Sequence, residues 1–215
     1  MKNKIIGIQG DKLDKINISS DTSIFLAHEA QKLGYKIFYY TPSNLSIIKN
    51  KTYANGVFVK LNYERKKFYK IYKKQKIDVE NFKFILIRQD PPFNSEYLIT
   101  TLILDNLKKT RVINNPVAIR NVSEKLYSKK FTKYMPDTIF SNNIEEVKKF
   151  YKQNKSIIMK PINGYGGNQI HLIKNKFDKK LITNFLNKNG HSMFQKFLKN
   201  ISKGDKRVFI INGKV

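Results

Sequence analysis

The sequence has 215 residues, of which 40% are hydrophobic, and this is enough apolar material for one large domain or two small ones. It contains no cysteine, which excludes a disulfide framework and a thiolate metal site. No apolar run approaches the roughly 20 residues that a membrane-spanning helix needs, and the N-terminal apolar run is too short for a signal peptide. These features predict a soluble, cytoplasmic protein with no membrane partner.

The formal net charge is +26, and a charge of this size usually indicates nucleic-acid or anionic-membrane binding. Only five of the 42 basic residues are arginine, the residue best suited to phosphate and base contacts. The abundant lysine, asparagine and isoleucine are the residues that AT-rich codons supply. We therefore attribute the charge to compositional bias and expect no specific nucleic-acid partner. The densest basic run, residues 65–76, predicts an amphipathic helix with a solvated face.

The first half of the chain alternates between strand and helix patterns. Such alternation predicts an α/β domain with a parallel sheet and right-handed crossovers. Strand patterns cover residues 4–8, 36–41, 82–88 and 111–114, and helix patterns cover residues 24–33 and 98–105.

Cap and turn residues predict where these elements begin and end. Ser19 or Ser20 is expected to cap the first helix, and Gly34 stands where a helix C-terminal glycine is common. Asn55-Gly56 lies between two short strand patterns, which is a strong signal for a two-residue β-hairpin turn.

The pattern changes after Pro116, so we place a domain boundary near residues 115–122 and expect domains at 1–120 and 121–215. Asn142 with Glu145 resembles a capping box. The second domain is expected to be α+β, with helices at residues 121–130, 144–151 and 179–186 and strands at residues 157–160, 170–173, 192–198 and 207–211.

The C-terminus contains a hairpin signal without room for the hairpin. Asn212-Gly213 calls for a returning strand, but only Lys214 and Val215 follow. A strand without its partner exposes unpaired backbone groups, which proteins usually avoid. We therefore expect the chain to be a fragment or a truncated form of a longer protein.

A lysine and a glycine-rich turn form the first candidate site. Lys160 ends a predicted strand, and Gly164, Gly166 and Gly167 follow it. Glycines allow positive φ and close approach of the backbone to an anion, and successive N–H groups can form a nest for phosphate oxygens. The turn lacks the GK[ST] of a P-loop. Taken alone, such a turn is more often structural than functional.

Neighbouring segments strengthen the case for a nucleotide site. Lys125 lies on a predicted helix, and residues 194–198 form a strand passing into a connection that suits an adenine. Asp205 and Arg207 concentrate charge before the last predicted strand. Two lysines, a glycine turn, an apolar connection and an Asp/Arg pair could together hold one nucleotide.

Four segments in chain order resemble motifs of bacterial glutathione synthetase, a family of ATP-grasp ligases. They are Arg88-Gln89-Asp90-Pro91-Pro92-Phe93, similar to R-K-D-P-P-F; Asn114-Asn115-Pro116 with Arg120-Asn121 and Glu124-Lys125-Leu126; Lys160-Pro161 with Gly164, Gly166-Gly167 and Ile170; and Gly204-Asp205-Lys206-Arg207-Val208 with Asn212-Gly213. The resemblance covers almost the whole chain. It implies an N-terminal parallel-sheet α/β domain of the pre-ATP-grasp kind, followed by an α+β ATP-grasp lid domain whose C-terminal part is largely missing.

The resemblance also implies residue roles. Arg207 would be catalytic, because the family's arginine there stabilises the acyl-phosphate and tetrahedral intermediates. Arg88 and Asp90 would contact substrate, with Asp11 and residues 21–23 as further candidates. The magnesium ligands would lie beyond Val215, so no residue here is assigned to metal. ATP contacts would come from Lys125, Lys160, Gly164, Tyr165, Gly166, Gly167, Gln169, Gln195, Lys196, Phe197, Leu198 and Asp205.

Two departures from the family are visible: Gln89 replaces a lysine and Asn94 replaces an acid. The first puts a substrate contact in doubt. The implied reaction joins γ-glutamylcysteine to glycine through an acyl phosphate, using ATP and Mg²⁺, in a protein that is a homo-oligomer when full length. The fragment alone is expected to be inactive.

Two alternatives stay open. The chain could be another ATP-grasp carboxylate–amine ligase, such as a dipeptide or ribosomal-protein-modifying ligase, although residues 90–93 belong to the substrate side of the glutathione synthetase pattern. It could also be a basic, non-catalytic nucleic-acid-binding module, which would bind RNA or DNA tightly with a steep salt dependence.

Overall fold

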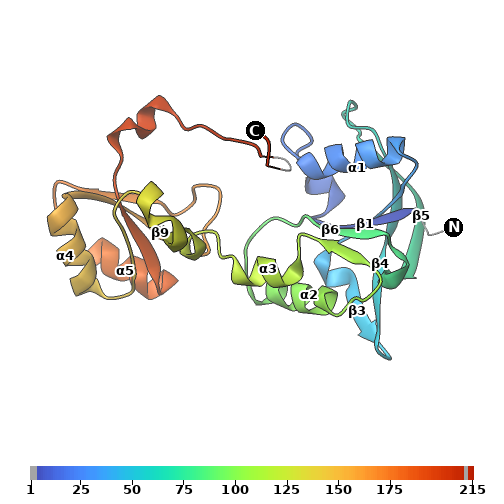
Figure 1. Cartoon of the computed structure of the whole chain (residues 1–215), viewed down its shortest axis with the longest axis horizontal. Helices are drawn as coiled ribbons and strands as arrows, with labels where there is room; N and C mark the ends of the chain where they lie inside the picture. Colours follow the sequence, from blue (N-terminus) through green and yellow to red (C-terminus); the bar gives the residue numbers. More distant parts are fainter. Residues whose placement is uncertain (1–3, 211–212) are drawn as a thin grey trace. The chain divides into compact units, whose positions relative to one another are not determined.

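The computed structural model describes residues 4–210 and 213–215. The chain divides into two compact units, Met1–Val122 (unit 1) and Ser123–Val215 (unit 2) (Figure 1). Each unit has its own sheet and its own buried core. Among the described residues, none of the helices combines the length and the apolar character that crossing a membrane requires. The mixed α/β architecture confirms the predicted fold class.

Unit 1 is built on a seven-stranded sheet with a parallel centre. Its path runs β3-β4-β2-β1-β6-β7, and β5 pairs with β4. The β1–β2, β1–β6 and β6–β7 pairs are parallel, which confirms the parallel sheet expected from the sequence. The strands are β1 (Ile5–Gln9), β2 (Lys36–Tyr40), β3 (Leu45–Ile48), β4 (Lys51–Leu61), β5 (Tyr69–Asp78), β6 (Phe84–Ile87) and β7 (Arg111–Ile113).

Helices cover both faces of this sheet, with α1 (Thr22–Lys32) on one side and α2 (Ser95–Asp105) and α3 (Pro116–Asn121) on the other (Figure 1). Ile24 of α1 packs in a fully buried cluster with Ile8 and Ile37. Leu104 of α2 belongs to a second cluster that contains Phe38 and Ile85. The sheet is therefore buried on both faces, as parallel sheets usually are.

The first helix begins one or two residues later than the sequence suggested. Its N-cap is Asp21, whose carboxylate accepts a hydrogen bond from the Ile24 backbone N–H at 2.7 Å. Ser19 and Ser20 instead bond to Asn17 within the preceding turn, so the predicted serine cap is wrong. Gly34 has φ +81°, as expected for a residue that ends a helix.

The predicted Asn55-Gly56 hairpin is wrong, because both residues lie inside the continuous strand β4. The turn between β3 and β4 is Lys49-Asn50, with φ values of +47° and +60°. Gly56 is required for close approach of two strands. A Cβ at this position would lie 2.4 Å from the Tyr39 carbonyl oxygen and 2.7 Å from the Phe38 ring.

The predicted helix at residues 65–76 is also wrong. Tyr69–Asp78 forms β5, which pairs antiparallel with β4 along Tyr53–Leu61. This pairing satisfies the backbone hydrogen bonds of the segment. Its lysines are compatible with a helix but do not require one. β5 is an edge strand with most of its side chains exposed.

Unit 2 contains a four-stranded antiparallel sheet in the order β10-β9-β11-β8. Two helices pack on it, and their buried residues Val147 and Ile182 meet Ile157, Met159 and Phe194 of the strands. The elements are β8 (Thr138–Ser141), α4 (Ile144–Asn154), β9 (Ser156–Pro161), β10 (His171–Lys174), α5 (Lys179–Asn189) and β11 (Ser192–Lys196).

Three expectations for the second half need correction. Residues 121–130 are not one helix, because α3 ends at Asn121 and a 3-10 segment, Leu126–Tyr134, starts only later. Lys125 therefore lies between helices. The N-cap of α4 is Asn143, whose side chain accepts from the Glu145 N–H, and not Asn142. Residues 207–210 contain no strand, while the last residue of that predicted strand, Ile211, and Asn212 of the predicted turn lie outside the described residues.

Gly56 provides a test of the close approach of β2 and β4. We expect Gly56→Ala to lower the free energy of unfolding by about 1–3 kcal/mol, because the added methyl group overpacks the contact with Tyr39 and Phe38. Asn55→Ala at the exposed neighbouring position is the control and should change stability little. Chemical denaturation of both variants measures the difference, and equal stabilities would contradict the packing argument.

Candidate functional site

The carboxyl ends of β1 and β6 form the polar end of the unit 1 sheet. These neighbouring parallel strands are followed by Asp11 and by Arg88 and Asp90. The chain proceeds from β1 to β2 on one side, whereas β6 and β7 lie on the other, so β1 and β6 flank a topological switch point. Ligands of open α/β sheets bind at such points, outside the carboxyl ends of the strands.

Hydrogen bonds fix these residues against one another. The Asp11 carboxylate accepts from the Asp90 backbone N–H at 2.8 Å. The Arg88 guanidinium donates to the Ser23 hydroxyl at 2.9 Å and to the Thr22 hydroxyl at 2.8 Å. The structure therefore brings together five of the six candidates that the sequence placed on the substrate side: an arginine, two carboxylates and two hydroxyls. The sixth, Asp21, caps α1.

A buried amide pair beneath this end was not predicted. The Gln9 side-chain amide donates to the Gln89 side-chain oxygen at 2.8 Å, and Gln9 is fully buried while Gln89 is 8% exposed. The only sequence signal for Gln9 is its amide within an otherwise apolar strand. Gln89, which stands where the resembled family has a lysine, thus points into the protein and bonds to a neighbouring strand. It offers no cation to a ligand.

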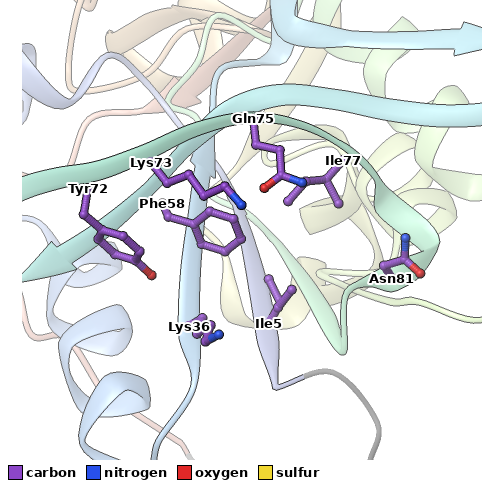
Figure 2. A pocket seen from close by; sticks show the side chains of 8 residues that line it. All are labelled: Ile5, Lys36, Phe58, Tyr72, Lys73, Gln75, Ile77 and Asn81. Carbon is purple, nitrogen blue, oxygen red and sulfur yellow. The ribbon is translucent and has the colours of Figure 1, made fainter.

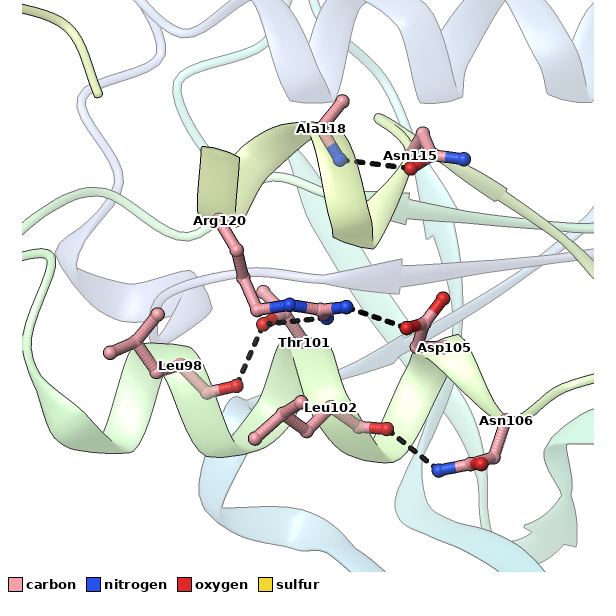
Figure 3. Close-up of polar contacts among 8 residues, drawn as sticks. All are labelled: Leu98, Thr101, Leu102, Asp105, Asn106, Asn115, Ala118 and Arg120. Carbon is pink, nitrogen blue, oxygen red and sulfur yellow. Dashed lines mark hydrogen bonds and ion pairs between the residues drawn. The ribbon is translucent and has the colours of Figure 1, made fainter. Parts of the chain in front are cut away.

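A second network joins α3 to α2 (Figure 3). Arg120 forms an ion pair with Asp105 at 2.6 Å and donates to the Thr101 hydroxyl at 3.4 Å. Asn115 caps α3 by accepting from the Ala118 N–H at 2.9 Å. The motif residues Asn115 and Arg120 therefore hold the last helix of unit 1 in place.

In unit 2, Lys125, Lys160 and the glycine turn converge. The Lys125 ammonium donates to the carbonyl oxygens of Ile162 and Gly164, at the base of the turn. It also pairs with Glu124 at 3.2 Å. Lys125 has only 12% of its side chain exposed, so this cation is held in one position beside the loop.

Lys160 is half-buried at the end of β9, two residues before Ile162, whose carbonyl oxygen accepts from Lys125. Its ammonium donates to the Gln195 side-chain oxygen at 3.2 Å, and the Gln195 amide donates to the Thr138 hydroxyl at 2.9 Å. Burial, and then the neighbouring Lys125 charge, lower the pKa of Lys160 below its ordinary value, while Glu124 opposes this shift. Two ammonium groups at close quarters make a site whose charge is best balanced by an anion.

The turn between β9 and β10 has the backbone that an anion nest requires. Gly166 and Gly167 have φ values of +60° and +75°, and Gln169 also has positive φ, +59°. A Cβ on Gly164 would lie 2.4 Å from the Pro161 ring. Residues 165–170 are exposed. Glycines are needed here both for left-handed backbone and for close packing. The Gly164 and Asn168 N–H groups donate to the Pro161 and Tyr165 carbonyl oxygens within the turn, so the neighbouring N–H groups of Tyr165, Gly166 and Gly167 are the ones placed to meet phosphate oxygens.

The remaining predicted contacts divide into two groups. Gln195 and Lys196 end β11 on the same sheet as Lys160, and Phe197 and Leu198 follow directly. Phe197 is fixed by a bond from its N–H to the Ser156 oxygen at 3.0 Å.

Asp205 and Arg207 are exposed within residues 204–210, which contain no helix or strand. Among the described residues, no hydrogen bond or ion pair joins either side chain to the two lysines. The structure therefore does not bring this Asp/Arg pair to the glycine turn.

The part of the chain that the structure describes contains no group of three or more His, Asp or Glu side chains placed to hold a metal ion. Divalent magnesium prefers carboxylate and phosphate oxygens. Lys125 and Lys160 are cations, and the one carboxylate described beside them, Glu124, pairs with Lys125. This region therefore fits a polyanion and does not fit a magnesium ion.

Lys125 provides a test of how the glycine turn is held. We expect Lys125→Met to increase amide hydrogen exchange in residues 163–169, because the bonds from its ammonium to the Ile162 and Gly164 carbonyls are lost. Lys129→Met, at an exposed lysine nearby, is the matched control and should leave exchange unchanged. Unaltered protection in the Lys125 variant would show that the turn is held by other contacts.

Comparison with known protein families matches both units. Residues 5–120 match the family described as prokaryotic glutathione synthetase, N-terminal domain, and residues 124–215 match prokaryotic glutathione synthetase, ATP-grasp domain.

Curated relatives named glutathione synthetase match the chain along most of its length. The protein of Mesorhizobium japonicum is 37% identical over 97% of this chain and 68% of its own length. That of Buchnera aphidicola subsp. Acyrthosiphon pisum is 36% identical, over 97% and 67%. The chain thus spans about two thirds of the relatives it matches.

Solved structures of two synthetases and an ATP-grasp ligase share the fold at low sequence identity. D-cycloserine synthetase DcsG matches with a TM-score of 0.59 at 12% identity, covering 92% of this chain and 60% of that one. D-alanyl-alanine synthetase A from Vibrio cholerae matches with a TM-score of 0.56 at 14% identity, covering 93% and 61%. The ATP-grasp ligase PsnB, solved with Mg and ADP, matches with a TM-score of 0.54 at 14% identity, covering 92% of this chain and 66% of that one. With the motifs, the lysine pair and these matches in place, the chain belongs to the prokaryotic glutathione synthetase family.

Proposed function

We propose that this chain carries the nucleotide-binding lysines and the acid-binding face of an ATP-dependent ligase that joins γ-glutamylcysteine to glycine. The observation that carries the proposal is the convergence of Lys125, Lys160 and the glycine turn. The reaction and the substrate pair are those that the resemblance to glutathione synthetase implies, and relatives of that name support them. In this proposal residues 1–120 form the substrate domain, and residues 121–215 begin the ATP-grasp domain.

The proposed reaction has two transfers. An oxygen of the acid's carboxylate attacks the γ-phosphorus of ATP, and the bond to ADP breaks. The amine nitrogen of glycine then attacks the acyl carbon, phosphate leaves, and the amine gives up a proton as the peptide bond forms. Charge moves between phosphate oxygens in both steps, so fixed cations stabilise it.

The residues of this chain have separate roles in the proposal. Lys125 and Lys160 meet the phosphates, and the loop of residues 164–169 covers them. Closure of such a loop keeps water from the acyl phosphate, which would otherwise hydrolyse. Gln195 to Leu198 contact the adenine, and Asp205 lies near the ribose and phosphates. Arg207 is proposed to stabilise the intermediates, which requires the exposed segment 204–210 to approach the site.

On the acid side, the Arg88 guanidinium is proposed to bind a substrate carboxylate, since an arginine fork matches that group. Its bonds to Thr22 and Ser23 orient it. Asp90 and Asp11 would meet the substrate ammonium group. The described residues offer magnesium no ligand set, so none of them is assigned to it. Residues 1–215 alone are proposed to bind nucleotide weakly without turnover.

The nucleotide site is tested by calorimetric titration of residues 1–215 with ATP. We expect Lys160→Gln to weaken binding by about tenfold or more, the scale of a lost charge-assisted hydrogen bond. Lys152→Gln removes the same charge from the exposed face of α4 and should weaken binding much less. Equal losses of ATP affinity in the two variants would show that binding depends only on the net charge of the protein.

The pH dependence of binding gives an independent measurement. Because the pKa of Lys160 is lowered in the free protein, a bound polyphosphate should raise it again. Binding should therefore take up protons, and affinity should fall as the pH rises through the lowered pKa of Lys160, which lies below its ordinary value. Calorimetry in two buffers of different ionisation enthalpy measures this uptake, which should disappear in Lys160→Gln. Proton release in the unsubstituted protein would contradict the assignment.

The substrate pair needs a chain that spans the full length of the relatives. We expect release of ADP from such a protein to require both γ-glutamylcysteine and glycine, and Arg88→Lys to raise the KM for the acid more than that for ATP. Preference for another acid and amine in a substrate panel would assign the chain to a different ATP-grasp ligase. Turnover by residues 1–215 alone would contradict the proposal that they only bind nucleotide.

A further inference from the structure

A cavity lies at the opposite end of the unit 1 strands from Asp11 and Arg88. Its volume is about 350 Å³, near the lower end of the range for small-molecule sites. Ile5 and Lys36 are register partners at the first residues of β1 and β2, so they mark the amino ends of the parallel strands. The lining residues are Ile5, Lys36, Phe58, Tyr72, Lys73, Gln75, Ile77 and Asn81 (Figure 2).

The floor of this cavity is apolar. Phe58 and Ile77 are 6% and 8% exposed and belong to the buried core. The Tyr72 ring stacks on Phe58, with centroids 5.9 Å apart and planes at 29°, yet Tyr72 is 56% exposed. An aromatic surface that is stacked on one side and open on the other can accept another flat group.

A β-bulge places Tyr72 in the cavity. Phe58 pairs with Lys73 and the next residue, Val59, pairs with Ile71, so Tyr72 is the extra residue of β5. In a regular strand, Tyr72 and Lys73 would point to opposite faces of the sheet. Here both line one space, and bulges are often found where a side chain is redirected at a binding site.

The rim of the cavity carries positive charge. Lys73 and Lys36 line it from two different strands, and Gln75 and Asn81 add amide groups. The salt bridges of the described residues include neither lysine. The lining contains no carboxylate, so an anion entering it would meet two ammonium groups and no repelling charge.

We propose that this cavity binds a small organic anion with a flat apolar body, of the aromatic carboxylate class. Its ring would pack against Phe58 and Tyr72, its carboxylate would meet the Lys73 ammonium, and Lys36 would add positive charge at the rim. A triphosphate-bearing nucleotide carries more charge than two ammonium groups balance. This site is separate from the proposed substrate and nucleotide sites and does not depend on the function proposed for them.

Titration of the ¹⁵N-labelled chain with benzoate, followed by NMR, tests the proposal. We expect saturable shifts of amides in β4 and β5 around Phe58 and Tyr72, and about tenfold weaker binding in Lys73→Gln, the scale of one charge-assisted bond. Lys74→Gln removes the same charge from the adjacent residue of β5, which does not line the cavity, and should leave the Kd unchanged. Benzamide, which has no carboxylate, should bind at least as weakly as benzoate binds to Lys73→Gln.

Three results would overturn the proposal. The first is absence of saturable benzoate binding to the folded chain. The second is an equal loss of affinity in the Lys73 and Lys74 variants, which would indicate attraction to the basic surface in general. The third is a set of shifts confined to residues outside β1, β2, β4 and β5. The spectra of the two variants without ligand report directly whether each is folded.

Discussion

The contact between the Lys125 ammonium and the Gly164 carbonyl is the interaction on which the proposed site of unit 2 depends. It ties a lysine that lies outside any helix to the base of the glycine turn, within reach of the Lys160 charge. Holding two like charges together costs electrostatic free energy in the empty protein. Binding of the proposed polyphosphate would offset that cost.

The parts of the fold that local sequence pattern controls were predictable. Apolar runs such as Ile5–Gln9 and Phe84–Ile87 must be buried on both faces, which calls for a parallel sheet covered by helices. The approach of Lys125 to Lys160 was also anticipated, although from the order of motifs and not from any single residue. Each of these lysines by itself would more often be a solvated side chain.

The errors arose where distant residues decide the local structure. Nothing near residues 65–76 shows that β4 offers them an edge, so a basic amphipathic pattern was read as a helix. Asn55-Gly56 has the composition of a turn. Gly56 is needed for another reason, because a Cβ at this position would lie 2.4 Å from the Tyr39 carbonyl oxygen. The role of Gln9 could not be predicted because its side chain bonds to Gln89, which is 80 positions away in the sequence.

The lysines of β5 have a consequence for how copies of the protein meet. In the part of the chain that the structure describes, β5 pairs only with β4, so its outer side could template a neighbouring strand. Lys70, Lys73, Lys74 and Lys76 lie along it, and a second copy would bring the same charges into register. Charged edge strands of this kind discourage edge-to-edge pairing between the sheets of two copies. The protection weakens as salt rises, since about 1 M ionic strength shortens electrostatic reach to about 3 Å.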